Sequence, residues 1–183
     1  QKQNITNQWD SILNVGGNKS FFLSKYGEVK KSTVINFTLR DKTNPSSVLS
    51  LIGNARQNAR VVRNNLTKEV FETINETYLI LSNIFKRPIN EKNLLNTLSI
   101  IRTKCQLARG TLHGTMLRDD TYILARMGTF IERADNTSRI LDIKYYVLLP
   151  SVGFVGSNVD NAQWENILRS VSAYRSYNWL NEY

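Results

Sequence analysis

The sequence is poor in cysteine and proline, and each shortage excludes a class of structure. Cys105 is the single cysteine among 183 residues, so no intramolecular disulfide can form. A lone thiol fits a reducing, cytoplasmic setting and predicts a small, buried, apolar side chain at this position. The three prolines, Pro45, Pro88 and Pro150, stand where connections between helices are expected, which leaves room for long helices elsewhere.

Long apolar runs and cofactor motifs are also missing. No run approaches the roughly 18 residues of a membrane-spanning helix, so no membrane association is expected. The opening segment QKQNITNQWD has no hydrophobic signal region and no initiating methionine, and we expect upstream sequence to be missing. No Glu-x-x-His pair, zinc motif, phosphate-binding loop or GxSxG elbow is present. Neither metal nor cofactor is therefore expected, and an enzyme of a common class is disfavoured.

Basic residues outnumber acidic ones: 24 Lys and Arg against 15 Asp and Glu give a net charge of +9. Such a surplus raises nucleic-acid binding as a hypothesis. However, the basic residues are spread along the chain, and no RNA-binding signature or zinc-finger spacing accompanies them. A basic helical bundle that binds nucleic acid is therefore the least favoured of the three functional hypotheses for this chain.

Apolar residues recur every three or four positions, and no segment alternates with period two for long, so helices are predicted and strands are not. The fold class is all-α, a bundle of about six to eight helices in one domain over residues 1–183. Helices are expected at about 8–15, 19–26, 31–39, 45–66, 67–84, 91–109, 119–149 and from 160 onward. Asn44 is expected to cap the fourth.

A short segment recurs 155 residues later. Gln8–Leu13, QWDSIL, returns as Gln163–Leu168, QWENIL, with Trp, Ile and Leu on one helical face in both copies. Chance is one explanation. The other is an internal duplication, which would divide the bundle into two pseudo-repeated halves.

The strongest cationic pattern is ARQNARVVR, at residues 55–63. On an α-helix Arg56, Arg60 and Arg63 fall within about 60° of one another, beside the apolar stripe. Arginine at such a boundary buries its stem and presents a planar fork that can hold a phosphate or a carboxylate through two bonds. A solvated helix edge, or ion pairs to a neighbouring helix, remain as alternatives.

An acidic row follows in IERADNTSRILD, at residues 131–142. Glu132, Asp135 and Arg139 share one face, with the last two forming an i,i+4 pair. This face lies almost opposite the helix's apolar stripe of Ile123, Met127, Phe130, Ala134 and Leu141, which favours a solvated surface. Because the arginine segment contains no acid, we expect the arginine row to dock on this acidic row.

The segment GTLHGTMLRDD, residues 110–120, surrounds the only histidine, His113, with two glycines. Glycine inside a helix costs about 1 kcal/mol against alanine, so Gly110 and Gly114 are expected to mark a break or a close approach of another backbone. Gly128 is expected to admit a neighbouring helix in the same way. His113 is a candidate general base, although a structural role is the usual one for a lone histidine.

Four segments together resemble the alpha-E domain family: NPSSVLSLIGNARQNARVVR, TMLR, GTFIERADNTSRILDIKYYVLLP and QWENILRSVSAYRSY. They occur in that family's order from about Trp9 to Tyr177. The residues that match its charged motifs are Asn54, Arg56, Asn58, Arg60, Arg63, Arg118, Glu132, Arg133, Asp135 and Arg139.

The resemblance implies a bacterial, mostly helical protein with a genomic association to ATP-grasp-type peptide ligases and transglutaminase-like peptidases. Family members commonly open with another ERAENT-like helix and continue past the position of Tyr183. The chain therefore resembles a central portion that lacks upstream and downstream parts of the full pattern.

Three hypotheses follow. The first is an accessory or scaffold protein of a peptide-ligase system, which binds a partner or an acidic substrate through the arginine face. The second is an enzyme that makes or cleaves peptide bonds, with Glu132 or Asp135 as acid or base and the arginines holding substrate. The third is the nucleic-acid-binding bundle. The oligomeric state is left open.

Overall fold

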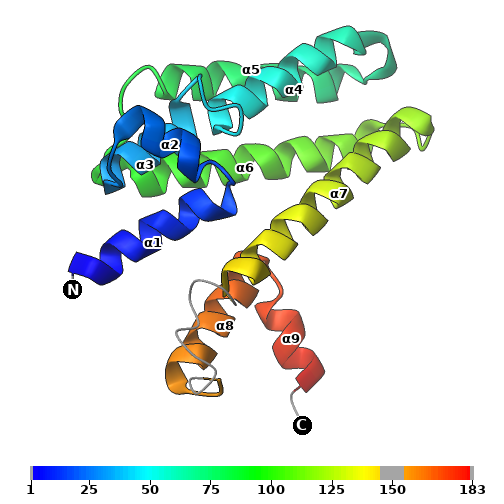
Figure 1. The fold of residues 1–183 in the computed structure, drawn as a ribbon. Coiled ribbons are helices and arrows are strands. Elements are labelled where there is room, and N and C mark those ends of the chain that lie inside the picture. Colours follow the sequence, from blue (N-terminus) through cyan, green and yellow to red (C-terminus); the bar gives the residue numbers. More distant parts are fainter. Residues whose placement is uncertain (1, 145–154, 182–183) are drawn as a thin grey trace.

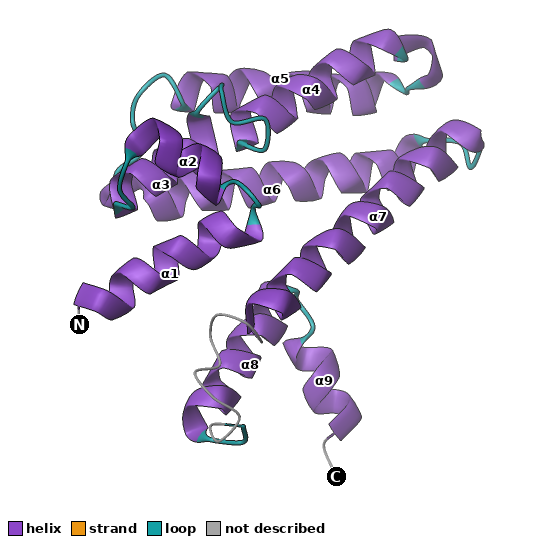
Figure 2. Cartoon of the chain, in the orientation of Figure 1, coloured by secondary structure: helices purple, strands orange, loops and turns teal. Residues whose placement is uncertain are grey.

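The computed structural model describes residues 2–144 and 155–181, which are helical and contain no strand (Figure 1, Figure 2). The all-α class is confirmed. The helices are α1 (Lys2–Val15), α2 (Lys19–Tyr26), α3 (Lys31–Arg40), α4 (Val48–Val61), a 3-10 turn η1 (Arg63–Asn65), α5 (Lys68–Ile84), α6 (Glu91–Thr115), α7 (Asp120–Ile143), α8 (Asn158–Ser170) and α9 (Tyr174–Asn181).

Nine α-helices in the described ranges exceed the six to eight that were expected. The reason is a turn after Ser170, where the backbone of Ser172 takes a positive φ of 60° and divides the last segment in two. The end of the long helix predicted for residues 119–149, including its stop at Pro150, falls partly outside the described residues.

The core lies where α3 joins two groups of helices. On one side α5 packs between α4 and α6, and Ile35 and Leu39 of α3 meet Leu81 and Phe85 from α5 and its end. On the other side α3 covers the hairpin of α1 and α2. There the buried residues are Leu13, Phe22, Val34 and Phe37. Helix α3 thus joins the N-terminal hairpin to the α4–α5–α6 layer.

Two local predictions about helix ends are wrong. Ser47, not Asn44, caps α4, because the Ser47 hydroxyl accepts a bond from the Ser50 N–H at 3.2 Å. Asn44 is instead buried and donates to the carbonyl of Phe37 at 3.1 Å. Helix α4 also ends at Val61, so Arg63 lies in the following 3-10 turn rather than on the same α-helix as the other two arginines.

The glycines of α6 do not interrupt it, because α6 continues to Thr115. A Cβ added at Gly110, Gly114 or Gly128 would meet no heavy atom within 4 Å, so none of the three marks a close approach in the described structure. The expectation of a break or a helix contact at these positions is wrong. Cys105, expected to be buried, is exposed on α6.

Helix α7 leaves the end of α6 at an elbow and runs obliquely to α1, its main neighbour (Figure 1). Its predicted inward stripe is largely exposed, at 54% for Ile123, 51% for Met127 and 50% for Phe130. The burial predicted for this stripe is therefore wrong within the described residues. Near the other end of α7, Arg139 approaches Gly17 in the turn that follows α1.

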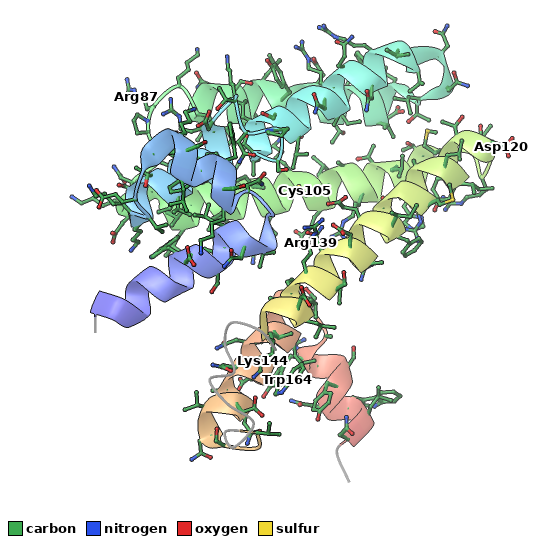
Figure 3. All side chains as sticks on the ribbon, viewed as in Figure 1. Arg87, Cys105, Asp120, Arg139, Lys144 and Trp164 are labelled. Atoms are coloured by element: carbon green, nitrogen blue, oxygen red, sulfur yellow. The ribbon has the colours of Figure 1, made fainter. Side chains whose placement is uncertain are left out.

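A buried ion pair fastens the end of α7 to α8. Lys144 is 1% exposed in its side chain, and its Nζ donates to Asp160 and, at 2.9 Å, to Gln163. The same ammonium group lies 5.5 Å from the ring centroid of Trp164, and Figure 3 labels both residues. The bond from Lys144 and the backbone N–H of Gly156 lower the pKa of Asp160. The positive charge of Lys144 at this junction is therefore neutralised by the carboxylate of Asp160.

The hairpin of α1 and α2 recurs as α8 and α9. Shifted by 155 residues, Lys19–Tyr26 falls on Tyr174–Asn181, and the last residue of α1, Val15, falls on the last residue of α8, Ser170. Both helices of the first hairpin therefore have a counterpart with matching ends.

The two hairpins also share their turn. Gly17 has a φ of 65° and its counterpart Ser172 a φ of 60°, the only non-glycine with positive φ in the described residues. In both hairpins the N–H of the next residue donates to a carbonyl five residues earlier. The bond runs from Asn18 to Leu13 at 3.1 Å in the first hairpin and from Ala173 to Leu168 at 2.7 Å in the second. A residue of positive φ is a common way to end a helix, so the shared turn is compatible with both explanations of the sequence echo, and duplication stays a prediction.

Candidate functional site

Arg56 of the GNAR segment is held against α5. Its Nε donates to Asn75 Oδ1 at 2.7 Å, and its guanidinium lies 4.5 Å from the ring centroid of Tyr78. Gly53 lies beside the same ring, since a Cβ there would be 3.8 Å from Tyr78 Cε2. The planar fork of Arg56 is therefore used to join α4 to α5, as a hydrogen-bonded and stacked arginine does.

Arg63 is anchored in a similar way, but Arg60 is not. The Arg63 guanidinium lies 4.5 Å from the ring centroid of Phe71 and donates to the carbonyl of Leu66 at 3.3 Å. Arg60 and Asn58 are both exposed on α4, in directions about 160° apart around the helix axis. The predicted row of three equivalent arginines therefore consists of two anchored side chains and one that projects into solvent.

The acidic row does not meet these arginines. Glu132 accepts a bond from Asn136 at 2.9 Å, and Asp135 accepts one from Arg139 at 2.8 Å, all on the exposed surface of α7. The main neighbours of α4 are α5 and α3, whereas that of α7 is α1. The prediction that the two rows dock on each other is wrong for the described residues, because α5 occupies the flank of α4 that carries the anchored arginines.

The two rows differ in how far their charge is neutralised. On α7 the pair of Asp135 and Arg139 compensates itself, and the bond to Asp135 raises the pKa of Arg139. On the α4 side, Arg56, Arg60 and Arg63 form no ion pair with any acid of the described chain. The positive charge of the arginine segment is thus left uncompensated within this structure.

His113 lies at the elbow between α6 and α7. Its Nε2 is 3.1 Å from Arg126 Nη1 and its Nδ1 is 2.8 Å from Tyr122 Oη. Because arginine only donates, Nε2 is the acceptor, and the neutral ring then donates from Nδ1 to Tyr122. Arg118 donates to the His113 carbonyl at 2.9 Å and lies 4.2 Å from the Tyr122 ring centroid.

The cluster of His113, Arg118, Tyr122 and Arg126 has a structural role at this elbow. Both ring nitrogens of His113 are engaged by Tyr122 and Arg126, and no carboxylate or thiol orients the ring. The geometry therefore gives no support to His113 as a general base. Arg118 of the TMLR segment contacts His113 of α6 and Tyr122 of α7, and so joins the end of α6 to the start of α7.

The remaining predicted residues carry no catalytic arrangement. Arg133 is exposed and, in the part of the chain that the structure covers, its side chain forms no ion pair. Within residues 2–144 and 155–181 no three His, Cys, Asp or Glu side chains come together as a metal site would require. In the same ranges no helix has both the length and the apolar character to cross a bilayer.

Sequence reasoning missed the residues of α5 that hold the arginines. Phe71, Asn75 and Tyr78 recur at i, i+4 and i+7, so they share one face of α5. That spacing was available as a signal, since two aromatic rings on a helix next to an arginine segment offer stacking surfaces.

The comparisons with known proteins agree with the helical architecture. A family model described as a predicted alpha-helical domain with a conserved ER motif matches residues 1–182. The ER pair in this chain is Glu132 and Arg133. No match was found to a curated protein or to a solved structure.

Proposed function

The chain belongs to the alpha-E family, and from that membership and the geometry above we propose that it is an accessory binding domain of a bacterial peptide-ligase system. In this role it recruits an ATP-grasp-type ligase, a transglutaminase-like protein or their acidic substrate. The partner class comes from the family resemblance. The proposed binding residue is Arg60, which is exposed on α4 next to the anchored Arg56; Asn58, two residues earlier on the same helix, faces another direction and is not part of this surface.

One observation carries this proposal: the arginines of the α4 segment have no internal counter-ion in the described chain. Arg56 and Arg63 are fixed by stacking and hydrogen bonds to α5, which makes the surface rigid. Arg60 projects from that surface. An uncompensated guanidinium on a rigid helix suits an acidic partner, because electrostatic complementarity sets which partner is accepted and how fast it associates.

The two alternatives receive less support. A working carboxylate needs surroundings that shift its pKa, and Glu132 and Asp135 are exposed and engaged with residues of their own helix. A nucleic-acid-binding bundle would concentrate its basic residues. In the described ranges, seven lysines are instead spread over the chain and paired with acids, namely Lys19, Lys25, Lys30, Lys31, Lys68, Lys104 and Lys144.

The test is a quantitative pull-down with the cognate ATP-grasp protein. Arg60→Glu reverses the projecting charge and is expected to weaken binding about tenfold or more, with a steep dependence on salt. Arg102→Glu, an equal charge change on the exposed face of α6, is the matched control and is expected to leave binding unchanged. Equal binding by wild type and Arg60→Glu would refute the proposed surface.

A further inference from the structure

A polar cleft opens between α2, α3, α4 and α5. Its volume is about 870 Å³, within the size range of sites that hold small organic ligands. Gly53 and Asn54 of the GNAR segment form part of its wall, together with Tyr78, the ring on which Arg56 is stacked. The most distinctive motif of α4 therefore borders this cleft as well as the outer arginine surface.

The cleft is strongly cationic. Arg40, Lys42 and Lys86 line it, and none of the three forms an ion pair within the described part of the chain. Arg40 is fixed in place, because its Nε donates to the carbonyl of Phe85 at 2.9 Å and its Nη2 to that of Lys86 at 3.4 Å. Its charge remains without a counter-ion, and the two lysines are exposed beside it.

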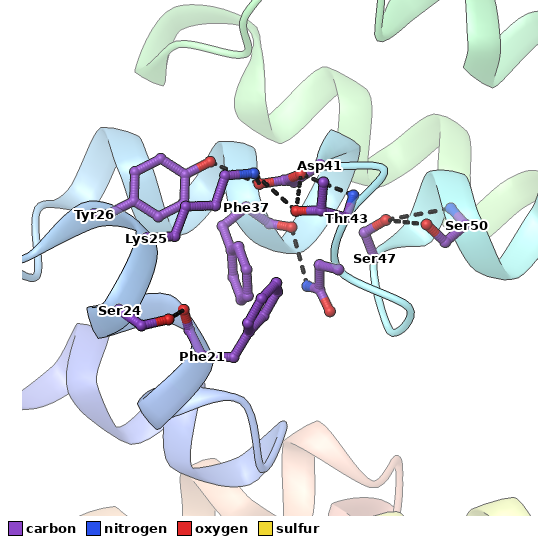
Figure 4. A network of polar contacts seen from close by, with 10 residues as sticks. Phe21, Ser24, Lys25, Tyr26, Phe37, Asp41, Thr43, Ser47 and Ser50 are labelled. Carbon is purple, nitrogen blue, oxygen red and sulfur yellow. Dashed lines mark hydrogen bonds and ion pairs between the residues drawn. The ribbon is translucent and has the colours of Figure 1, made fainter.

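The one acid of the cleft is already engaged. Asp41 accepts bonds from Lys25 at 2.6 Å, from Tyr26 at 2.7 Å and from Thr43 at 2.8 Å (Figure 4). Burial alone would raise the pKa of Asp41, but these bonds outweigh it and hold that pKa well below its usual range. Asp41 therefore stays ionised and cancels Lys25, which leaves the net positive charge of the other three residues facing the cleft.

The cleft also offers contacts for the body of a ligand. Leu49, Phe85 and the ring of Tyr78 supply apolar surface in its lining. Ser82 also lines the cleft, and its Oγ is buried and has no hydrogen-bond partner among the described residues. A buried hydroxyl without a partner is costly, and a bound ligand with a polar group would satisfy it.

From these features we propose that the cleft is a binding site for a small carboxylate-bearing ligand, of the size of a short acidic peptide. The carboxylates face Arg40, Lys42 and Lys86, while the backbone of the ligand lies along Tyr78 and Ser82. This site is distinct from the partner-binding surface around Arg60, and it does not depend on the function proposed there.

Isothermal titration with the tripeptide Glu-Glu-Glu tests the proposal, with inorganic phosphate and the uncharged tripeptide Gln-Gln-Gln as comparisons. The wild-type chain is expected to bind Glu-Glu-Glu saturably and Gln-Gln-Gln at least tenfold more weakly. The double variant Lys42→Ala/Lys86→Ala is expected to lose tenfold or more in affinity for the acidic peptide. The control Lys92→Ala/Arg102→Ala removes the same charge from exposed positions of α6 and is expected to bind as wild type does.

Ser82→Ala separates ligand contact from general electrostatics. It removes a hydroxyl that has no partner in the free protein, so the variant is expected to fold with unchanged or higher melting temperature and still bind the peptide more weakly. Equal loss in both double variants, phosphate binding without peptide binding, or no binding at all would overturn the proposal. Retention of the ATP-grasp partner by Lys42→Ala/Lys86→Ala would show that the two sites are independent.

Discussion

The guanidinium of Arg139 lies directly over Gly17: a Cβ at Gly17 would be 3.3 Å from Arg139 Nη1. This is the contact through which α7 meets the turn between α1 and α2. Arg139 is also the partner of Asp135, so one side chain joins the acidic surface of α7 to the N-terminal hairpin. The family-motif arginine on α7 is thus placed at a helix junction.

Gly17→Ala is expected to destabilise the protein by about 1–2 kcal/mol, because alanine is strained at a φ of 65° and its Cβ displaces Arg139. Urea denaturation measures the change. Gly27→Ala, at a φ of 74° with nothing within 4 Å, isolates the backbone cost. If Gly17→Ala costs no more than Gly27→Ala, the contact with Arg139 has no energetic weight.

Ser172→Gly is expected to stabilise the second hairpin by about 1 kcal/mol, since glycine accepts positive φ without the penalty of a side chain. Thermal unfolding followed by circular dichroism measures it. Ala162→Gly, at an exposed position inside α8, is the control and is expected to destabilise by about 1 kcal/mol. A loss of stability in Ser172→Gly would contradict the backbone geometry of this turn.

Arg56→Ala and Arg60→Ala are expected to differ although they remove the same charge from one helix. Arg56→Ala loses a hydrogen bond to Asn75 and the stacking on Tyr78, a cost of about 1–2 kcal/mol. Arg60→Ala is expected to change stability by less than about 0.5 kcal/mol, as for other exposed positions. Chemical denaturation of both variants provides the comparison, and equal values would remove the distinction between anchored and projecting arginines.

Asp41→Asn is expected to lower stability at neutral pH, with a difference from wild type that shrinks in acid. The pKa of Asp41 is lower in the folded chain than in the unfolded one, so its stabilisation is present above the ordinary aspartate pKa of about 4. That stabilisation is lost as the pH falls below 4 towards the folded-state value, because protonation then removes the acceptor of Lys25. Denaturation curves from pH 7 to pH 2.5 measure it, and a pH-independent difference would contradict it.

Much of the helical architecture was predictable because it depends on local pattern. The spacing of apolar residues located the helices, and α5 and α7 are capped by Thr67 and Asp119, the residues at which helices were expected to begin. The contacts between helices were not predictable from that pattern. Arg56 and Glu132 each lie on an identifiable face, but which helix covers that face depends on how the whole chain turns at its loops.

The same limit explains the errors at the candidate site. Helical periodicity placed three arginines in one row, yet α4 ends at Val61, so the last of them, Arg63, departs from that row. The cleft was not predicted either, because Lys86 is remote in sequence from Arg40 and Lys42 and none of the three belongs to a motif. Tertiary structure alone brings these cations together.

The paired hairpins give this polypeptide an internal reference. Each position in residues 9–26 can be compared with the one 155 places later, so two versions of one local fold stand in a single chain. Leu13 and Phe22, buried under α3, correspond to Leu168 and to Tyr177, which is 51% exposed. The second hairpin therefore accommodates an exposed tyrosine where the first buries a phenylalanine, and grafting Lys19–Tyr26 onto Tyr174–Asn181 would test whether the second hairpin accepts the sequence of the first.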